Sequence, residues 1–437
     1  MRNELGPPLR VFDQNVDMVR DRPINAFVAS EGKHVFDLIS DPRIVCSPTA
    51  ETPPDLVVFP CSKARLPFAE ALSALAHELG SRVCDGRTVL VFDASTEGAS
   101  HRPDPENELH TLLRCAQLPA ERCIYITQDR DHRRLYETRC KRANLGVMRV
   151  LNYDYYIKQL FKAHERDGKM TFERRLAAFE KRSRSRMRRL ISLNLSPRPT
   201  KVLFLLSLIR DGLWNEAFVS FSGMDKSKNF RAVSKLGLRK AIGELAAFGE
   251  LSDNLTPYLD VLESFGALEL GRLDRAAGRP DLIKPPVLDT SLAEYDQSWF
   301  TVVTETEMDG LWRITEKPFK AILNFHPALI LGNRGALEII KSLGFLTFPA
   351  YFDELYDYEP SAARRFSLVY EQVVRLCNIP ERDLSSKERA VADTLHFNAY
   401  WGLVELPRLY RDHFDRALVD QILDVLRQPC KIWTVNP

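Results

Sequence analysis

The sequence lacks the features that mark membrane-spanning and secreted proteins. Its longest apolar run, VLFLLSLI at 202–209, is far shorter than the roughly 20 residues that a membrane-spanning helix needs. Its first residues, MRNELGPPLRVFD, lack the apolar core of a secretory signal. The formal net charge of the 437 residues is only +2, so overall charge implies no binding to polyanions. We therefore expect a cytoplasmic protein, and its length predicts two domains.

Signatures of zinc and dinucleotide sites are also missing. None of the eight cysteines forms a CxxC pair or lies near clustered histidines, so we predict reduced thiols and no metal site. The first 155 residues contain no GxGxxG loop, which is the usual dinucleotide fingerprint. A ligand of this part of the chain would therefore be held by other means.

Strand and helix patterns alternate along two parts of the chain. In the first part, apolar runs predict strands at 55–60, 87–93, 122–128 and 146–152, with helices at 68–80, 106–118 and 131–143. In the second part, strands are predicted at 298–306, 327–332 and 345–348, with helices at 316–325 and 335–344. Such alternation indicates parallel sheets covered by helices. The predicted fold class is α/β, with two Rossmann-like domains facing a cleft and helices at the C-terminus.

The domain boundaries follow from changes in composition. We predict a first Rossmann-like domain at 1–155, a basic helical linker at 156–190, a second domain at 191–400 and C-terminal helices at 401–437 that pack back. Within the linker, FERRLAAFEKRSRSRMRRL at 172–190 carries eight Arg or Lys against two Glu. It fits a solvated helix or a surface for anionic lipid or an anionic substrate. Nucleic acid is less favoured, because no aromatic base-stacking platform is interleaved.

The segment FTVVTETEMDGLWRITEKPFKAILNFHPALILG at 300–332 carries the most chemistry. Glu305 ends a predicted strand, and in open parallel sheets ligands bind outside the carboxyl ends of strands. Thr315, Glu316 and Lys317 open the next predicted helix, whose first N–H groups and lysine suit phosphate oxygens. The acceptor oxygens of Glu305 and Glu316 suit sugar hydroxyls. The alternative is that Thr-Glu-Lys only caps a surface helix.

The pattern FTVVTET…RITEKPFKAI…HPALILG resembles the motif of the α1,3/4-fucosyltransferase family. The resemblance covers about residues 190–350 and is specific over about 35 of them. The resemblance implies the nucleotide-sugar half of a two-domain glycosyltransferase of the GT-B type, with 1–155 as the acceptor side. It also implies donor contacts in SLNLSPRPTK at 192–201, where Asn194 and Arg198 match the family and Lys201 lies nearby. The family usually has Asn where Thr306 stands here, and an aromatic residue where Arg313 stands, so the donor sugar stays open.

A catalytic base is expected in the first domain, because inverting glycosyl transfer needs a proton acceptor beside the attacking hydroxyl. The segment VLVFDASTEGASH at 89–101 ends a predicted strand in candidate groups. Glu97 comes first, Asp93 second, and His101 could serve instead. An ordinary solvated loop is the competing interpretation.

Together these observations predict an inverting, metal-independent glycosyltransferase without a cofactor. Its co-substrate would be a nucleotide sugar, with a GDP-sugar such as GDP-fucose favoured by the resemblance and a UDP-sugar open. Its acceptor would be a hydroxyl of a glycan, a lipid-linked glycan or another molecule, and the basic segment would place the enzyme at the inner face of the membrane. The alternative function is a non-catalytic protein that uses 172–190 to bind nucleic acid or membrane.

Overall fold

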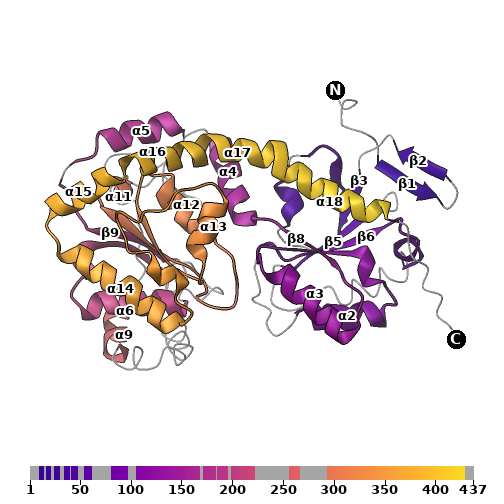
Figure 1. The fold of residues 1–437 in the computed structure, drawn as a ribbon, viewed down its shortest axis with the longest axis horizontal. Helices are drawn as coiled ribbons and strands as arrows, with labels where there is room; N and C mark the ends of the chain where they lie inside the picture. The colour runs from indigo at the N-terminus through magenta and orange to yellow at the C-terminus, as the bar shows by residue number, and fades with distance from the viewer. Residues whose placement is uncertain are drawn as a thin grey trace. The chain divides into compact units, whose positions relative to one another are not determined.

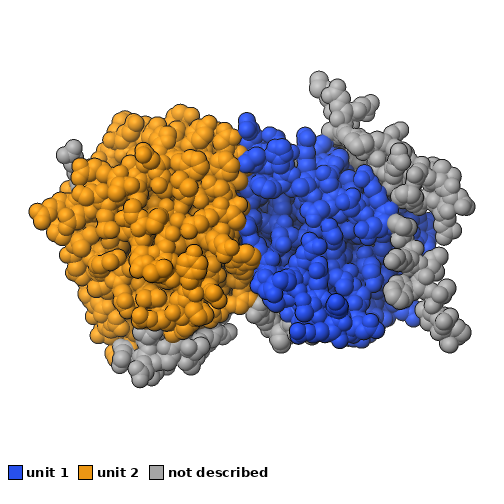
Figure 2. Space-filling view, in the orientation of Figure 1, with its two compact units in different colours: residues 1–159, 408–437 blue, residues 160–407 orange. Residues whose placement is uncertain are grey.

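The computed structural model divides into two compact units, which Figure 2 colours separately. Unit 1 comprises residues 1–159 and 408–437, and unit 2 comprises residues 160–407. The structure describes residues 9–13, 16–20, 24–29, 34–39, 41–47, 54–61, 80–96, 105–167, 171–183, 185–194, 198–221, 255–265 and 293–428. None of the helices in these ranges has the length and apolar content needed to cross a bilayer.

Unit 1 is built on a parallel sheet with the strand order β4-β3-β5-β6-β7-β8. Its strands are β3 Ile24–Val28, β4 Ile44–Ser47, β5 Leu56–Pro60, β6 Val89–Asp93, β7 Cys123–Thr127 and β8 Arg149–Asn152. A separate antiparallel hairpin pairs β1 Leu9–Asp13 with β2 Val16–Arg20. The four strands predicted for this part of the sequence are confirmed as β5 to β8, and their neighbours pair in parallel.

Helices cover both faces of this sheet (Figure 1). The helices are α2 Pro105–Cys115, α3 His132–Ala143, α4 Tyr155–Asp167, which continues into unit 2, and α18 Asp415–Arg427. Side chains alternate along β5, so that Leu56 and Val58 pack with α18 while Val57 and Phe59 pack with α2 and α3. Burial on both faces explains why the strands are continuous apolar runs. The predicted helix at 68–80 lies almost entirely outside the described residues.

Unit 2 contains a second parallel sheet with the order β10-β9-β11-β12. Its strands are β9 Leu190–Asn194, β10 Ala217–Phe221, β11 Phe300–Thr304 and β12 Ala328–Leu331. Its helices are α5 Phe172–Glu180, α6 Pro199–Arg210, α9 Leu259–Ser264, α11 Ala293–Asp296, α12 Lys317–Ile322, α13 Ala336–Ser342, α14 Ala362–Asn378, α15 Glu381–Ala390 and α16 Ala392–Tyr400, followed by α17 Leu406–Leu409 at the boundary. The predicted α/β class with two parallel sheets and C-terminal helices is confirmed.

One predicted strand of unit 2 is wrong. Residues 345–348 are irregular, because their backbone groups bond to side chains and to neighbouring turns instead of to another strand. The Asn398 side chain accepts from Leu346 N at 2.8 Å and donates to Leu346 O at 2.8 Å. Phe348 N donates to Glu354 Oε1 at 2.8 Å. Local apolar composition predicted a strand here, but hydrogen bonds go to the side chains of Asn398, 52 positions away, and of Glu354, six positions away.

The basic segment also differs from the prediction of one helix over 172–190. Helix α5 ends at Glu180, and the described residues that follow it up to β9 are irregular. Arg175 and Arg182 both pair with Asp296, at 3.1 and 2.8 Å. Arg186 pairs with Glu388 at 2.6 Å and lies 4.2 Å above the ring of Trp299. These three arginines therefore form ion pairs within unit 2, and they do not form a solvated cationic face.

Candidate functional site

The candidate site lies at the carboxyl ends of two neighbouring strands of unit 2. Strands β9 and β11 are parallel partners, so Asn194, which ends β9, and Glu305, which follows β11, lie at the same edge of the sheet. The chain enters α6 at Pro199 and α12 at Lys317. The first turns of both helices therefore follow these strand ends, as in ligand sites of other open parallel sheets.

Glu305 is the anchor of this site. Its side chain is nearly enclosed, with a residue exposure of 3%. Its carboxylate accepts from the Thr315 backbone N–H at 3.1 Å and lies 2.7–2.9 Å from the Thr315 hydroxyl, which donates its one proton to one oxygen at a time. The Lys317 ammonium lies 3.4 Å from Oε2. Glu305 thus holds the segment that opens α12 against the strand end.

Lys317 and Glu316 stay charged beside it. Burial favours the neutral amine of Lys317, but Glu305 and Glu316 outweigh that effect and raise its pKa. Burial likewise favours protonation of Glu316, but Lys317 and Lys320 outweigh it and lower its pKa. The Lys317 ammonium also donates to Thr315 Oγ1 at 2.8 Å. Two of the three N–H donors of the ammonium are therefore used by Glu305 and Thr315, and these two contacts orient it.

Lys201 is a second lysine in the same environment. It is the third residue of α6, and only 3% of it is exposed. Burial lowers its pKa to about 7, and the nearby charge of Lys317 adds to this effect, while Glu305 and Glu316 oppose it. Burial and the Lys317 charge therefore both disfavour its ammonium. An anionic ligand beside Lys201 would favour the charged form, so the position suits such a ligand.

The two other predicted donor residues have different surroundings. Asn194 is fully buried, donates to Ser192 Oγ at 3.0 Å and accepts from the Thr304 hydroxyl. Its side-chain amide therefore connects β9 to β11 beneath Glu305. Arg198 is the half-buried residue before α6, and it is near enough to Lys201 to contribute to the lowering of that pKa. The structure thus brings Lys201 and Arg198 close to Glu305, Thr315, Glu316 and Lys317, which we call the Glu305 cluster. Asn194 joins the two strands that lead to this site.

The candidate bases belong to unit 1, and only one of them can be described. Asp93 ends β6 with no exposed surface, and its carboxylate accepts from Ser95 N at 2.9 Å and from Val35 N. Burial is the main cause of its raised pKa. Asp93 thus closes the strand end by binding two backbone N–H groups. Glu97 and His101 lie outside the described residues.

Three residues near the site were missed by the sequence analysis. Lys320 is buried one turn after Glu316, and its charge helps to lower the Glu316 pKa. The signal was an acid and a base four residues apart. Gly332, which follows β12, lies against Glu305, and the buried Arg365 of α14 donates to the carbonyl of Gly332. Arg365 stands on the apolar stripe of its helix, which is an unusual position for an arginine.

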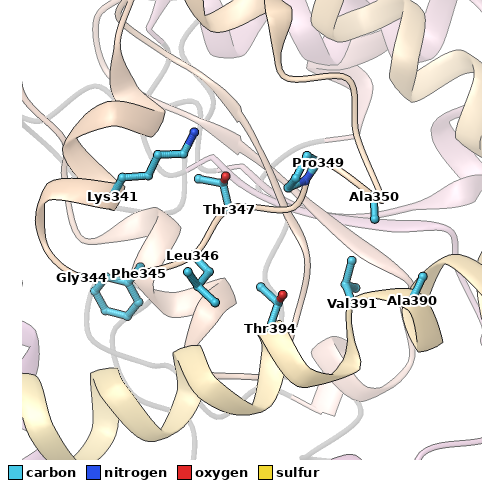
Figure 3. Close-up of a pocket in the computed structure, with 10 residues that line it drawn as sticks. All are labelled: Lys341, Gly344, Phe345, Leu346, Thr347, Pro349, Ala350, Ala390, Val391 and Thr394. Atoms are coloured by element: carbon cyan, nitrogen blue, oxygen red, sulfur yellow. The ribbon is translucent and has the colours of Figure 1, made fainter.

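A hollow of about 480 Å³ lies elsewhere in unit 2 (Figure 3). It is lined mainly by apolar side chains, and its lysine, Lys341, lies 3.6 Å from Glu354. Its lining residues are Lys341, Gly344, Phe345, Leu346, Thr347, Pro349, Ala350, Ala390, Val391 and Thr394. None of the Glu305 cluster lines it. Among the described residues, no three His, Cys, Asp or Glu side chains are grouped as metal ligands.

Comparisons with known proteins give only distant likenesses. No family model matches the chain, and a search of the curated proteins finds no match. Among solved structures, the chain is similar to the α,α-trehalose 6-phosphate synthase of Burkholderia multivorans, with a TM-score of 0.39 and 14% identity over 85% of this chain and 72% of that one. It is also similar to the UDP-forming α,α-trehalose-phosphate synthase of Burkholderia vietnamiensis, with a TM-score of 0.37 and 14% identity over 83% and 72%. At these values the likeness decides no function.

Proposed function

We propose that unit 2 binds the diphosphate of a nucleotide sugar and that the chain is an inverting, metal-independent glycosyltransferase of the GT-B type. The observation that carries the proposal is a pair of lysines at the strand ends around Glu305, the buried Lys201 and the half-buried Lys317. An anion bound here would favour the charged form of Lys201, which burial and Lys317 disfavour, and could accept from the third donor of the Lys317 ammonium. The motif that contains Lys317 resembles a family that uses nucleotide sugars, which supports the same ligand.

Each residue then has a chemical role. The acceptor oxygen attacks the anomeric carbon, the bond from that carbon to the diphosphate oxygen breaks, and the hydroxyl proton passes to a base. Lys317, Lys201 and Arg198 stabilise the charge that develops on the departing diphosphate, and the first N–H groups of α6 assist. Glu305 and Thr315 hold Lys317 in position. Glu97 is the proposed base, with Asp93 or His101 as alternatives, and the buried carboxylate of Asp93 makes it less suitable.

The donor and the acceptor belong to the same proposal. A GDP-sugar follows from the resemblance, with fucose as one candidate sugar, and the departures at Thr306 and Arg313 leave UDP-sugars open. The acceptor is a hydroxyl of a glycan or of a lipid-linked glycan. Phosphates and sugar hydroxyls need only cations and acceptor oxygens, and the cluster provides both.

The alternative function uses the basic segment 172–190 to bind nucleic acid or an anionic membrane. The structure gives this hypothesis little support, because Arg175, Arg182 and Arg186 are engaged in ion pairs within unit 2. Arg174 and Lys181 are exposed. Co-sedimentation with anionic vesicles tests whether segment 172–190 binds an anionic membrane. Binding that is lost in the double variant Arg174→Gln/Lys181→Gln and at high salt would support electrostatic membrane binding. Absence of binding at low salt would reject it.

The main experiment measures GDP and UDP binding by calorimetry, followed by hydrolysis of a panel of nucleotide sugars without added metal. We expect the wild type to bind at least one nucleotide, and Lys317→Ala to lower both its affinity and the rate, by roughly 10²–10³ in rate if the lysine acts as a preorganised charge. Lys181→Ala, an exposed lysine of the same unit, is the matched control. Failure of the wild type to bind either nucleotide, or unchanged kinetics in Lys317→Ala, would reject the proposal.

A further inference from the structure

We propose that Arg365 and Gly332 are positioning residues for Glu305. The buried guanidinium of Arg365, in α14, thereby sets the geometry of the Glu305 cluster. Neither residue belongs to the site cluster itself. The inference rests on the proposed function for its ligand, but its geometric part concerns only residues of unit 2. It follows from the contacts of Arg365, from the close approach of Gly332 to Glu305, and from the place of Gly332 at the end of β12.

Arg365 connects three loops that meet at the sheet edge. Its guanidinium has no exposed surface and donates from Nε to Gly332 O at 2.9 Å, from Nη1 to Glu359 O and from Nη2 to Met308 O. Gly332 follows β12, and Met308 lies three residues after Glu305 in the loop that leaves β11. A planar guanidinium with five N–H donors can hold carbonyls in fixed directions, which a lysine cannot do. Arg365 therefore fixes both loops that border Glu305.

Gly332 transmits this fixed position to Glu305 by direct packing. A Cβ atom built on Gly332 would lie 3.0 Å from Cγ and 3.1 Å from Cβ of Glu305. A side chain at this position would require Glu305 to move by a few tenths of an ångström, and no left-handed backbone angle is involved. Glu305 N also donates to Leu331 O at 2.8 Å, so the two strand ends are joined immediately beside the contact. The Glu305 side chain thus packs directly against the backbone of Gly332 at the end of β12.

The arrangement is not an efficient way to stabilise a core. Burying a guanidinium is costly unless it is well paired, and apolar side chains of similar size often stabilise a protein as much or more. The carboxylate nearest to Arg365 in an ion pair, Asp309, lies 3.3 Å away and is 66% exposed. The other N–H groups of Arg365 donate to backbone carbonyls of three loops, and the loops of Gly332 and Met308 border the site. This choice of partners indicates a role in fixing loop geometry.

The test uses Gly332→Ala, with Gly80→Ala as a control because a Cβ at Gly80 meets no atom within 4 Å. We expect the methyl group to push Glu305 by a few tenths of an ångström. Affinity for GDP or UDP should then fall about tenfold, since small misplacements of positioned groups have large effects. The thermal unfolding of both variants should match that of the wild type. Unchanged affinity in Gly332→Ala would overturn the proposal, and so would an equal loss in Gly80→Ala.

A second variant, Arg365→Lys, separates geometry from charge. It keeps the charge but cannot reach carbonyls in three loops, so affinity should fall below that of the wild type. Wild-type affinity in Arg365→Lys would overturn the geometric role. A wild type that binds neither GDP nor UDP rejects the proposed function instead. The crystal structure of Gly332→Ala then decides the positioning on its own, because a displaced Glu305 carboxylate supports it and an unmoved one overturns it.

Discussion

Replacement of Lys201 by methionine should make the protein more stable while it weakens nucleotide binding. Methionine has a similar length and no charge, so it fits the buried site without the cost of removing an ammonium from water. The wild-type lysine has its pKa lowered from 10.5 to about 7, with burial as the main cause. At 1.36 kcal/mol per unit of pKa, this difference corresponds to about 5 kcal/mol as an upper bound.

The pH dependence gives this prediction its sign. In the unfolded chain the lysine keeps its proton up to about pH 10.4, whereas in the folded protein it loses the proton near pH 7. Between these values the unfolded state binds more protons, so the stability of the wild type rises with pH. Below pH 7 both states are protonated and the full destabilisation is present. The advantage of Lys201→Met should therefore be largest at pH 6 and about 3 kcal/mol smaller at pH 9.

The assay is urea unfolding of the wild type and Lys201→Met at pH 6 and pH 9, followed by tryptophan fluorescence. Four of the five tryptophans lie in unit 2, so the signal reports on the unit that contains the site. Affinity for GDP and UDP is measured in parallel and should fall at least tenfold in the variant. A variant that is less stable than the wild type at pH 6 would refute the reasoning. A stability difference that does not change with pH would refute it as well.

Three further predictions concern other residues of unit 2. Burial raises the pKa of Asp357 to about 6, so wild-type stability should fall as pH rises from about 4 to 6, and Asp357→Asn, compared by thermal unfolding, should remove this decline. Arg186→Met should destabilise unit 2 by roughly 3–5 kcal/mol in urea, because it leaves the Glu388 carboxylate without the partner now at 2.6 Å; an unchanged midpoint would contradict this. Glu305→Gln should weaken nucleotide binding, measured by calorimetry, about as much as Lys317→Ala, because Lys317 loses the carboxylate at 3.4 Å. Additive losses of affinity in the double variant would contradict the coupling of the two residues.

Sequence patterns located strands β5 to β8 of the first sheet and β11 and β12 of the second, but they did not predict β3, β4, β9 or β10. Strands buried on both faces are continuous apolar runs, and the helices between them have their own period, so β5 to β8 and β11 to α13 could be located from local patterns. Glu305 and the Thr-Glu-Lys segment were singled out because one ends a strand and the other opens a helix. That position at the carboxyl ends of parallel strands is a consequence of chain order alone.

The roles of the charged residues depend on contacts that form only in the folded chain. The arginines of 172–190 have the composition of a solvated face, but Arg175 pairs with a residue 121 positions away and Arg186 with one 202 positions away. The same holds for the backbone of 345–348 and for Arg365, whose acceptors belong to three separate loops. Periodicity reports only on neighbours along the chain. The partner of a buried charge or of a loop carbonyl depends on which distant segments the fold brings together, and local patterns contain no information about that choice.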